Sequence, residues 1–401
     1  MKTYCSKCDL SFKDDSALYD HTLRACKTCM YCTFKFKDVD EIRKHMKVNH
    51  MQISCSQCQK RFFLQGGLDA HINHKHNPNE KKRPGGQRRR RPRPKNDLPK
   101  KSSNFFSEME EHDSVEQYLK DIVQPDQTVL ETYKEVIDRL KLLLQRKTQC
   151  TVSGVFKGGS FGKGTTIKAK SDIDAVVFIN DYKSVSDLKN DMEKVVEDLK
   201  HAIEHDEERD VVATNVRTTR YSIQFSLQDG RVDVDLLPAV DVLAGGSKAS
   251  VDVWKQIKLV ERAVQPYYSA SFAPQQVAFV KKCPSRVKDL IRLVKHWKRT
   301  DHVDIRSYCI ELMVINLWQK WGTPETFDTK DRLREIFQQL SSMRKIGITW
   351  PDEYDIQKFG GKPLSPYVMD PANPFMNTAP TSAQAKDVEG KARIVYRLLK
   401  Q

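Results

Sequence analysis

The fold is decided by a stretch from residue 158 to residue 174 that reads GGSFGKGTTIKAKSDID. A short predicted strand, residues 152–156, precedes it, and the apolar segment 175–179, which has the composition of a buried strand, follows it. The glycines do not form a P-loop, because that motif requires the Lys that follows its last glycine to be followed directly by Ser or Thr, whereas Lys163, after Gly162, is followed by Gly164. The chemistry therefore has to come from other residues of the stretch.

Asp172 and Asp174 stand two residues apart where the stretch enters the buried strand. Side chains at i and i+2 of a strand point to the same face, so the two carboxylates project together. Adjacent carboxylates repel each other unless a cation lies between them. The pair therefore predicts a metal site.

A third carboxylate is expected from a later hairpin. Residues 221–227 alternate apolar and polar side chains as a half-buried strand does, and residues 231–238 follow as the returning strand after an Asp-Gly turn. Asp233 and Asp235 share one face of that second strand, and the pattern alone lets either reach the metal. A Gly-Gly-Ser turn, an Asp-x-Asp strand and a later strand aspartate are typical of a nucleotidyltransferase. Two Mg²⁺ ions, about 3.5–4 Å apart, would activate the attacking hydroxyl and stabilise the leaving pyrophosphate.

Cysteine and histidine concentrate near the N-terminus, where seven of the ten cysteines fall in the first 58 residues. They form three repeats, each Cys-x2-Cys-x12-His-x4 followed by Cys or His, which is typical of tetrahedral zinc in small ββα fingers. Fingers of this size depend on the metal for folding, so up to three structural Zn²⁺ ions are expected. His74 is an alternative to His76 in the third repeat. The predicted zinc ligands are Cys5, Cys8, His21, Cys26, Cys29, Cys32, His45, His50, Cys55, Cys58, His71 and His76.

The spacing between the fingers leaves their role open. Arrays that track the DNA major groove use a fixed five-residue linker, whereas the first two fingers here are separated by Lys27 and Thr28 and the next two by residues 51–54. Contact with RNA or DNA by shape and binding to a protein partner both remain possible interpretations.

The net charge is concentrated in one segment. The 401 residues carry 68 Lys and Arg against 53 Asp and Glu, a net charge of +15, and residues 81–101 hold eleven of the basic residues and only one acidic residue. This segment also has four prolines, so we expect it to be disordered and to serve as a nuclear localisation signal, a phosphate-binding tether or a plain spacer. No apolar run approaches the roughly 18 residues of a membrane span. We expect a soluble protein of the cytoplasm, the nucleus or both, without a membrane span and of unknown oligomeric state.

A basic stripe is predicted on a later helix. Lys288, Arg292, Lys295 and Arg299 recur at helical spacing, and apolar residues occupy the opposite side. Such a stripe either faces solvent or binds phosphates.

Residues 113–401 resemble the 2′-5′-oligoadenylate synthetases and, more broadly, the cyclic GMP-AMP synthase-like receptors. The resemblance rests on GGSFGKGTTIKAKSDIDAVVF, VDVDLLPAVDVL, PSRVKDLIRLVKHW, RSYCIELMVINLW and DPANP, in the family's order. It implies that the catalytic and magnesium-binding residues are Asp172, Asp174 and Asp235, with Asp233 structural. It further implies nucleotide contacts from Ser160, Lys163, Arg292, Lys295, Ser307 and Tyr308, the last as a ring on which adenine stacks.

The same resemblance addresses the activator. Ser307 stands where vertebrate oligoadenylate synthetases have Gln, and the zinc-binding insertion of cyclic GMP-AMP synthase is absent. By this resemblance, the absence of the zinc-binding insertion favours double-stranded RNA over double-stranded DNA as the activator. Lys157, Ser285 and Arg286 occupy the family's RNA-contacting positions.

The sequence thus predicts an α/β (α+β) protein with zinc-bound fingers, a nucleotidyltransferase core with a mixed sheet, and a helical C-terminal lobe. The expected domains are fingers at 1–78, a basic disordered linker at 79–112, the core at 113–260 and the helical domain at 261–401. The expected activity is duplex-RNA-activated synthesis of 2′-5′-linked oligoadenylates from ATP, with GTP as a possible second substrate, in innate antiviral RNA sensing. The alternatives are a cyclic dinucleotide synthase and a catalytically inactive zinc-finger protein that binds nucleic acid.

Overall fold

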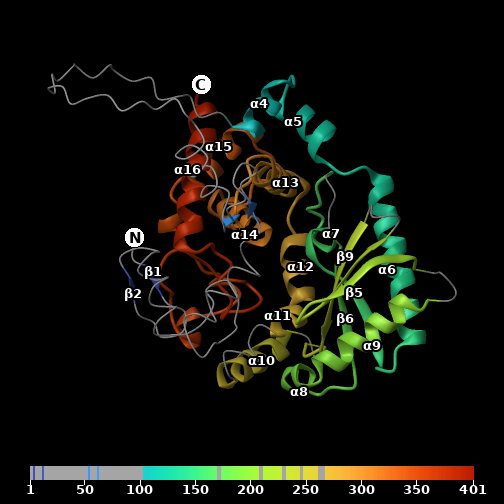
Figure 1. Cartoon of the computed structure of the whole chain (residues 1–401). Coiled ribbons are helices and arrows are strands. Elements are labelled where there is room, and N and C mark those ends of the chain that lie inside the picture. The colour runs from blue at the N-terminus through green and yellow to red at the C-terminus, as the bar shows by residue number, and fades with distance from the viewer. Residues whose placement is uncertain are drawn as a thin grey trace. The chain divides into compact units, whose positions relative to one another are not determined.

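The computed structural model, drawn in Figure 1, describes residues 103–168, 173–206, 211–227, 232–243, 247–260 and 267–401, with the backbone of four short strands nearer the N-terminus. The side chains of residues 247–250 lie outside this description. The chain divides into two compact units, residues 1–96 and 97–401.

The first unit contains two short antiparallel hairpins. β1 (Thr3–Tyr4) pairs with β2 (Ser11–Phe12), and β3 (Ile53–Ser54) pairs with β4 (Arg61–Phe62). In the sequence, each hairpin encloses the Cys-x2-Cys of a predicted finger. The zinc ligands themselves lie outside the described residues, so the fingers stay a prediction.

The second unit is built on a five-stranded mixed sheet with the strand order β5-β6-β9-β8-β7. Only the central pair, β6 and β9, is parallel, and the other neighbours are antiparallel. The predicted hairpin is therefore confirmed as β8 and β9. The strands are β5 (Val152–Lys157), β6 (Ile173–Ile179), β7 (Ala213–Thr218), β8 (Ile223–Leu227) and β9 (Val232–Ala239).

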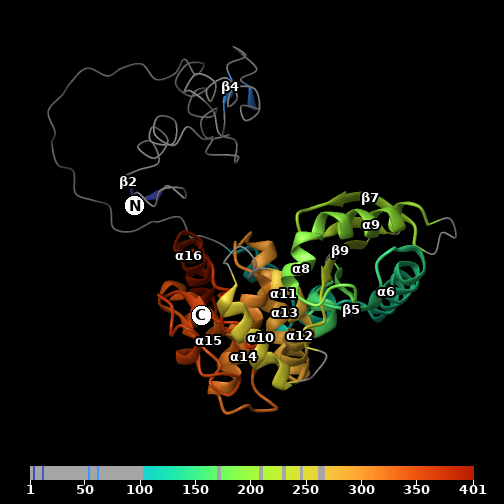
Figure 2. The ribbon, with the colours of Figure 1, turned by 90° about the horizontal axis from the view of Figure 1, so that it is seen from below.

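Helices cover the two faces of this sheet unequally. α6 (Gln127–Lys147) and α9 (Met192–Glu204) pack their apolar sides on one face, and α9 lies along β7 (Figure 2). On the other face, Ala273 of α12 (Ala273–Lys281) covers Val176 and Phe178 of β6. The remaining elements of the core are α7 (Gly159–Lys163), α8 (Val185–Asn190), α10 (Ser247–Leu259) and α11 (Tyr268–Ser271).

The C-terminal part of the chain is a helical lobe. Its main helices are α13 (Ser285–Thr300), α14 (Ser307–Lys320), α15 (Thr329–Leu340) and α16 (Ser382–Leu398). α16 begins with a capping box in which Thr381 and Gln384 satisfy each other's backbone N–H groups. Between α15 and α16 lie the turns η4 (Met343–Lys345) and η5 (Ile356–Phe359) and the parallel pair β10 (Gly347–Ile348) and β11 (Tyr367–Val368). The predicted mixed sheet and helical C-terminal lobe are thus confirmed.

The start of the folded unit corrects one predicted boundary. The range 79–112 was predicted to be a disordered linker, yet α4 (Asn104–Glu110) lies inside it and is followed by α5 (Val115–Tyr118) and the π-turn η2 (Leu119–Val123). Phe105 is fully buried, and Asp301 at the end of α13 accepts hydrogen bonds from Ser103 Oγ (2.6 Å) and Phe105 N (3.1 Å). The buried apolar residues of α4 make this helix part of the folded unit. Among the described residues, no helix is long and apolar enough to cross a membrane.

Candidate active site

One end of the sheet's second face is polar and open. Along β6, Ile173, Ala175 and Val177 enter the main core, so Asp174 points to the opposite face. The same alternation along β9 buries Val234 and turns Asp235 to the face of Asp174. The parallel register of β6 and β9 places these two aspartates directly opposite each other.

Asp235 carries an unsatisfied oxygen. Its Oδ1 is buried and has no hydrogen-bond partner among the residues that the structure describes. A buried carboxylate oxygen without a partner is costly and points to a bound cation. Asp174 and Asp235 therefore fit a divalent metal such as Mg²⁺, for which carboxylate oxygens are the preferred ligands.

Asp233 differs from Asp235 although both line the same face. Ser226 Oγ on β8 donates a 2.7 Å hydrogen bond to Asp233 Oδ1. The geometry thus favours Asp235 as the metal ligand where the sequence pattern had left both possible. Asp172 lies outside the described residues. Among the residues that are described, no cluster of three potential metal ligands is found.

The glycine-rich turn packs directly on Asp174. Gly158 N donates a 2.8 Å hydrogen bond to the backbone carbonyl of Asp174, and Gly159 has a left-handed φ of 51°. A Cβ on Gly159 would overlap Oδ2 of Asp174, so only glycine fits. The turn then opens α7, which carries Ser160 and Lys163. The sequence-predicted loop and the carboxylate strand are therefore in contact.

The basic stripe on α13 is docked rather than free. Arg292 donates to the carbonyls of Gly164 (2.6 Å) and Thr166 (3.1 Å), and Lys295 donates to the carbonyl of Thr165 (2.8 Å). The sequence predicts burial for the apolar side of this helix alone, yet the side chain of Lys295, on the basic side, is also buried. Both cations hold the segment after α7 in this structure, and their contacts with nucleotide phosphates stay a prediction.

Glu311 is a site residue that sequence analysis missed. It is buried, its Oε2 lies 3.0 Å from Lys163 Nζ, and its Oε1 lies 3.7 Å from Lys295 Nζ and accepts a 2.7 Å hydrogen bond from Thr165 Oγ1. Burial acts to raise the pKa of Glu311, but the two ammonium groups outweigh it and lower that pKa. Burial lowers the pKa of Lys295 to about 8. A single Glu within the otherwise apolar run of α14 was the available signal.

Tyr308 is fixed at both ends. Its hydroxyl donates a 2.9 Å hydrogen bond to Oδ1 of the buried Asp370, and Lys163 Nζ lies 3.7 Å from the centre of its ring. Asp370 also accepts hydrogen bonds from Gln276 (2.6 Å) and from Ala372 N (2.8 Å). Burial raises the pKa of Asp370 and, with the nearby carboxylate, that of Tyr308. One ring face of Tyr308 is thus covered by an ammonium group.

The remaining predicted contacts lie outside this network. Ser307 accepts a 3.2 Å hydrogen bond from Lys298 Nζ. Lys157 lies 3.5 Å from Asp138 of α6, while Ser285 and Arg286 are exposed at the start of α13, where Arg286 donates to the carbonyl of Phe327 (2.9 Å). The RNA contacts of Lys157, Ser285 and Arg286 stay predictions.

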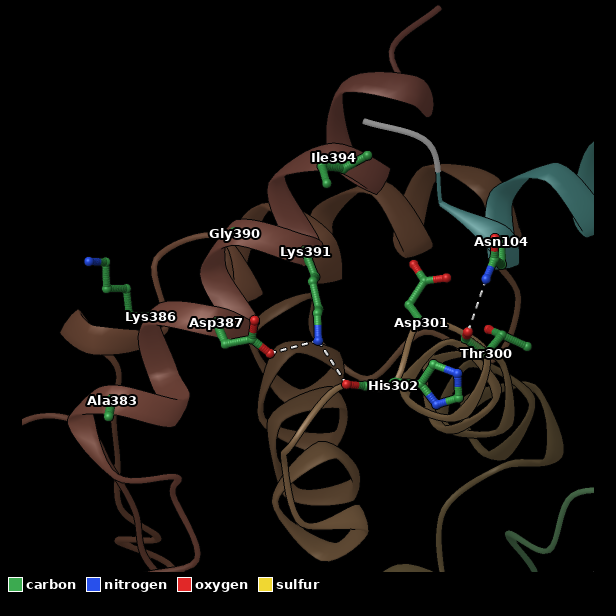
Figure 3. A pocket seen from close by; sticks show the side chains of 10 residues that line it. All are labelled: Asn104, Thr300, Asp301, His302, Ala383, Lys386, Asp387, Gly390, Lys391 and Ile394. Atoms are coloured by element: carbon green, nitrogen blue, oxygen red, sulfur yellow. Dashed lines mark hydrogen bonds and ion pairs between the residues drawn. The ribbon is translucent and has the colours of Figure 1, made fainter. Parts of the chain in front are cut away.

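A groove of about 590 Å³ opens over the carboxylates. It is lined by Asp174, Asp235 and Asp233 and extends over β8 and β7 to Arg217. A larger pocket, about 780 Å³, lies between α4, the end of α13 and α16 (Figure 3). There Lys391 Nζ is held by Asp387 (2.8 Å) and by the carbonyl of His302 (2.7 Å). We therefore place the candidate active site in the smaller groove, where the unsatisfied carboxylate lies.

The mixed sheet, the glycine turn on Asp174 and the paired strand aspartates define a nucleotidyltransferase. Solved structures share the fold, and two of them serve as examples. They are CdnC of E. coli MS115-1 with ATP (19% identity, TM-score 0.51, 71% of this chain and 90% of that chain) and mtPAP in complex with UTP (14%, 0.52, 85% and 83%).

Sequence comparisons narrow the class. Residues 109–250 match the family model of the Second Messenger Oligonucleotide or Dinucleotide Synthetase domain, and residues 247–398 match that of 2′-5′-oligoadenylate synthetase 1, domain 2, C-terminus. The chain is 30% identical to 2′-5′-oligoadenylate synthase 1A of Rattus norvegicus over 57% of this chain and 72% of the relative. It is 28% identical to 2′-5′-oligoadenylate synthase 2 of Homo sapiens over 65% of this chain. The chain belongs to the 2′-5′-oligoadenylate synthetase family and is a nucleotidyltransferase of that type.

The relatives differ in length and activity. The chain spans 41% of the human synthase 2 but 82% of synthase 1A of Mus musculus, to which it is 29% identical. A relative from Rattus norvegicus with 29% identity is named an inactive 2′-5′-oligoadenylate synthase 1B. Sequence similarity alone therefore does not decide whether this chain is active, and the evidence for activity has to come from the residues of its site.

Proposed function

We propose that this protein joins ATP molecules into 2′-5′-linked oligoadenylates and that duplex RNA activates it. The observation that carries the proposal is the pair of facing carboxylates, Asp174 and Asp235, at the glycine turn of a chain from this family. In the reaction, a ribose 2′-oxygen bonds to the α-phosphorus of a second ATP. The bond from that phosphorus to the bridging oxygen breaks, pyrophosphate leaves, and the hydroxyl proton is released.

Asp174 and Asp235, with Asp172, would hold two Mg²⁺ ions. Bound magnesium makes the hydroxyl a better nucleophile and neutralises charge on the leaving group. The chain's own part is positioning: glycine at 158 and 159 lets the turn pack against Asp174, so donor phosphates bound at the turn would lie next to this carboxylate, within reach of Ser160 on α7. Holding the reactants in one geometry is a large part of such a catalyst's effect.

The adenine is proposed to stack on Tyr308. Lys163 covers one face of that ring, so in our proposal Lys163 exchanges the ring and Glu311 for the donor triphosphate when the nucleotide binds. The hydrogen bond to Asp370 keeps the ring in place during this exchange. Arg292 and Lys295 would be available to phosphates only if the segment 164–166 also shifts.

Activation is proposed to occur through Lys157, Ser285 and Arg286, which would read the backbone of duplex RNA by shape and charge. The N-terminal zinc fingers and the basic segment 81–101 would add phosphate contacts and raise the affinity. The same basic segment is proposed to direct part of the protein to the nucleus, with the remainder sensing foreign RNA in the cytoplasm.

A cyclic dinucleotide product is the second candidate. It is favoured by the family model matched by residues 109–250, whose description includes dinucleotide synthetases. The third candidate, an inactive nucleic-acid-binding protein, has a named precedent among the relatives. Retention of a costly unpaired carboxylate at Asp235 argues against it.

Product analysis tests the three candidates. The protein is incubated with ATP, GTP and Mg²⁺, with duplex RNA, duplex DNA or single-stranded RNA of equal length, and the products are identified by mass and by resistance to 3′-5′-specific nuclease. We expect linear nuclease-resistant oligoadenylates with duplex RNA. A cyclic product favours the second candidate, activation by DNA contradicts RNA sensing, and no product under any condition favours the third.

A further inference from the structure

The segment that follows α7 is attached to two different parts of the chain. From α13, Arg292 donates to the carbonyls of Gly164 (2.6 Å) and Thr166 (3.1 Å). From the other side, the carbonyl of Val123 at the end of η2 accepts a 2.7 Å hydrogen bond from Lys168 N. η2 itself packs on α13, and it is a π-turn, a rare conformation that is often found at functional sites. The segment is therefore held from α13 and from η2 at the same time.

Asp289 joins these two attachments. Its Oδ1 accepts hydrogen bonds from Gln124 Nε2 (3.0 Å) and from Arg292 Nη1 (2.6 Å). Gln124 directly follows η2 in the chain, and Asp289 lies one turn before Arg292 on α13. The contacts thus run from η2 through one carboxylate to the guanidinium that holds residues 164–166.

The Arg292 guanidinium is fixed in direction and neutralised in charge. Its Nη1 donates to Asp289, its Nη2 to the Gly164 carbonyl and its Nε to the Thr166 carbonyl. Because the group is planar and rigid, three hydrogen bonds in different directions set its orientation. The side chains of Arg292 and Asp289 are only 16% and 19% exposed, so solvent screens their attraction weakly. A phosphate that approached Arg292 would meet the Asp289 carboxylate and be repelled by it.

We propose that Asp289 and Gln124 are positioning residues that keep Arg292 on residues 164–166, so that Arg292 fixes the end of α7 instead of binding donor phosphates. This inference rests on the proposed function, in which α7 carries contacts to the donor nucleotide. The family resemblance predicts phosphate contacts for Arg292, and the carboxylate of Asp289 argues against them in this chain. A binding loop that is held in place before the nucleotide arrives loses less entropy on binding, and it places the reacting phosphate correctly.

Asp289→Asn separates the two roles of Arg292 by the sign of its effect. If Arg292 holds the segment, loss of the carboxylate lets the guanidinium move. We then expect the Kd of a non-hydrolysable ATP analogue to rise by about 5- to 10-fold, part of one charge-assisted hydrogen bond, and kcat to fall by about 10-fold. If Arg292 binds phosphate, the same substitution removes a competing anion and the Kd falls. A Kd that falls or stays at the wild-type value would overturn the inference.

A double-mutant cycle tests whether Asp289 acts through Arg292. Removal of Asp289 should change little once the guanidinium is gone, so Asp289→Asn combined with Arg292→Gln should bind the analogue as Arg292→Gln alone does. Asp289→Glu keeps the negative charge beside Arg292 and should recover part of the affinity that Asp289→Asn loses. Additive losses in the cycle would contradict a role through Arg292.

Asp331→Asn is the matched control. Asp331 forms the same i,i+3 pair with Arg334, at 2.7 Å, but on α15, and neither residue lines the groove over the carboxylates. This variant should keep the wild-type Kd and kcat. An equal loss of affinity in Asp331→Asn and Asp289→Asn would overturn the inference, because the effect would then follow from any broken pair of this kind.

Amide hydrogen exchange separates this inference from the proposed function, because it requires no turnover. The amides of Thr165 and Lys168 bond to α7 and to η2, respectively. They should exchange about 10-fold faster in Asp289→Asn and in Gln124→Met, which keeps the side-chain volume, while the amides of β9 stay at the wild-type rate. If the wild-type protein makes no product, the proposed function fails, yet faster exchange of these two amides would still support the inference. Unchanged exchange in both variants would overturn it even when oligoadenylates are made.

Discussion

Two charged regions of this molecule carry opposite signs and opposite degrees of satisfaction. On the open face of the sheet, opposite Asp174, Asp235 has a buried oxygen with no partner in the described part of the chain. Where α13 meets the segment after α7, Arg292 and Lys295 are held by backbone carbonyls, by Asp289 and by Glu311. The Oδ1 atom of Asp235 is therefore open to a ligand, whereas Arg292 and Lys295 already hold the segment after α7.

The difference shows what a charge pattern in a sequence can and cannot reveal. Both regions look like ligand sites when read as periodic charges. Only the partners of each group distinguish an unsatisfied site from an internal brace, and those partners come from distant segments of the chain. The changes that follow test the carboxylate site, the contacts of the buried cations and the helix that packs on α13.

Substitutions at the paired carboxylates should have the largest effect. Asp235→Asn or Asp174→Asn removes a metal ligand, and we expect the rate of oligoadenylate synthesis to fall by about 10³-fold or more. Asp233→Asn is the matched control, because this carboxylate has a hydrogen bond from Ser226. Steady-state rates and melting temperatures of the three variants are measured together. A greater loss of rate in Asp233→Asn than in Asp235→Asn would mean that the wrong residue of β9 has been chosen.

Removal of the Glu311 charge should destabilise the buried Lys163–Glu311–Lys295 cluster rather than the carboxylate site. Glu311→Gln leaves Lys163 and Lys295 buried without their counter-charge, at a cost of about 3–5 kcal/mol in the free energy of unfolding. Glu389→Gln, which breaks a pair with the half-exposed Arg344, should cost less. Denaturant unfolding measures both, and adding Lys295→Met to Glu311→Gln should recover part of the loss. Equal losses in the two single variants would show that the Lys163–Glu311–Lys295 cluster has no special role.

Two N-terminal deletions examine the helix that supports α13. Deletion of residues 1–101 retains α4 and should leave the melting temperature of the remaining unit unchanged, while it weakens nucleic-acid binding and its salt dependence. Deletion of residues 1–112 removes the buried Phe105 and Met109 and should cost at least about 3 kcal/mol. Equal free energies of unfolding for the two deletion variants would contradict the inclusion of α4 in the folded unit. If deletion of residues 1–101 leaves the salt dependence of nucleic-acid binding unchanged, the fingers and the basic segment do not contact nucleic acid.

The pH dependence of stability should report Lys295. Burial lowers its pKa from the ordinary 10.5 to about 8, so between these values the unfolded chain holds a proton that the folded chain has released. The free energy of unfolding therefore rises with pH in this window, by at most about 1.4 kcal/mol per pH unit from this group. Lys295→Met removes the contribution. Urea unfolding from pH 8 to 10.5 should give a shallower slope for the variant, and parallel curves would contradict the proposed environment.

Much of this architecture was predictable because it follows from local pattern. Alternation along β8 and β9 predicted their pairing, and the Gly-Gly-Ser turn and the Asp-x-Asp strand were assigned to one site, although their direct contact is seen only in the structure. The choice of Asp235 over Asp233 rested on family resemblance, since the distinguishing bond comes from Ser226 on another strand. Glu311 and Asp370 were missed because their significance depends on burial beside Lys163 and Tyr308, which lie far away in the sequence.

Cation binding by the carboxylates is the central claim, and Mn²⁺ reports it directly by electron paramagnetic resonance. The zinc-loaded protein is titrated with Mn²⁺ in the presence of a non-hydrolysable ATP analogue, in wild-type, Asp233→Asn and Asp235→Asn forms. We predict that wild-type and Asp233→Asn bind two Mn²⁺ ions with similar affinity and that Asp235→Asn loses at least one of them. An Asp235→Asn isotherm that coincides with the wild-type isotherm would contradict the assignment of the active site.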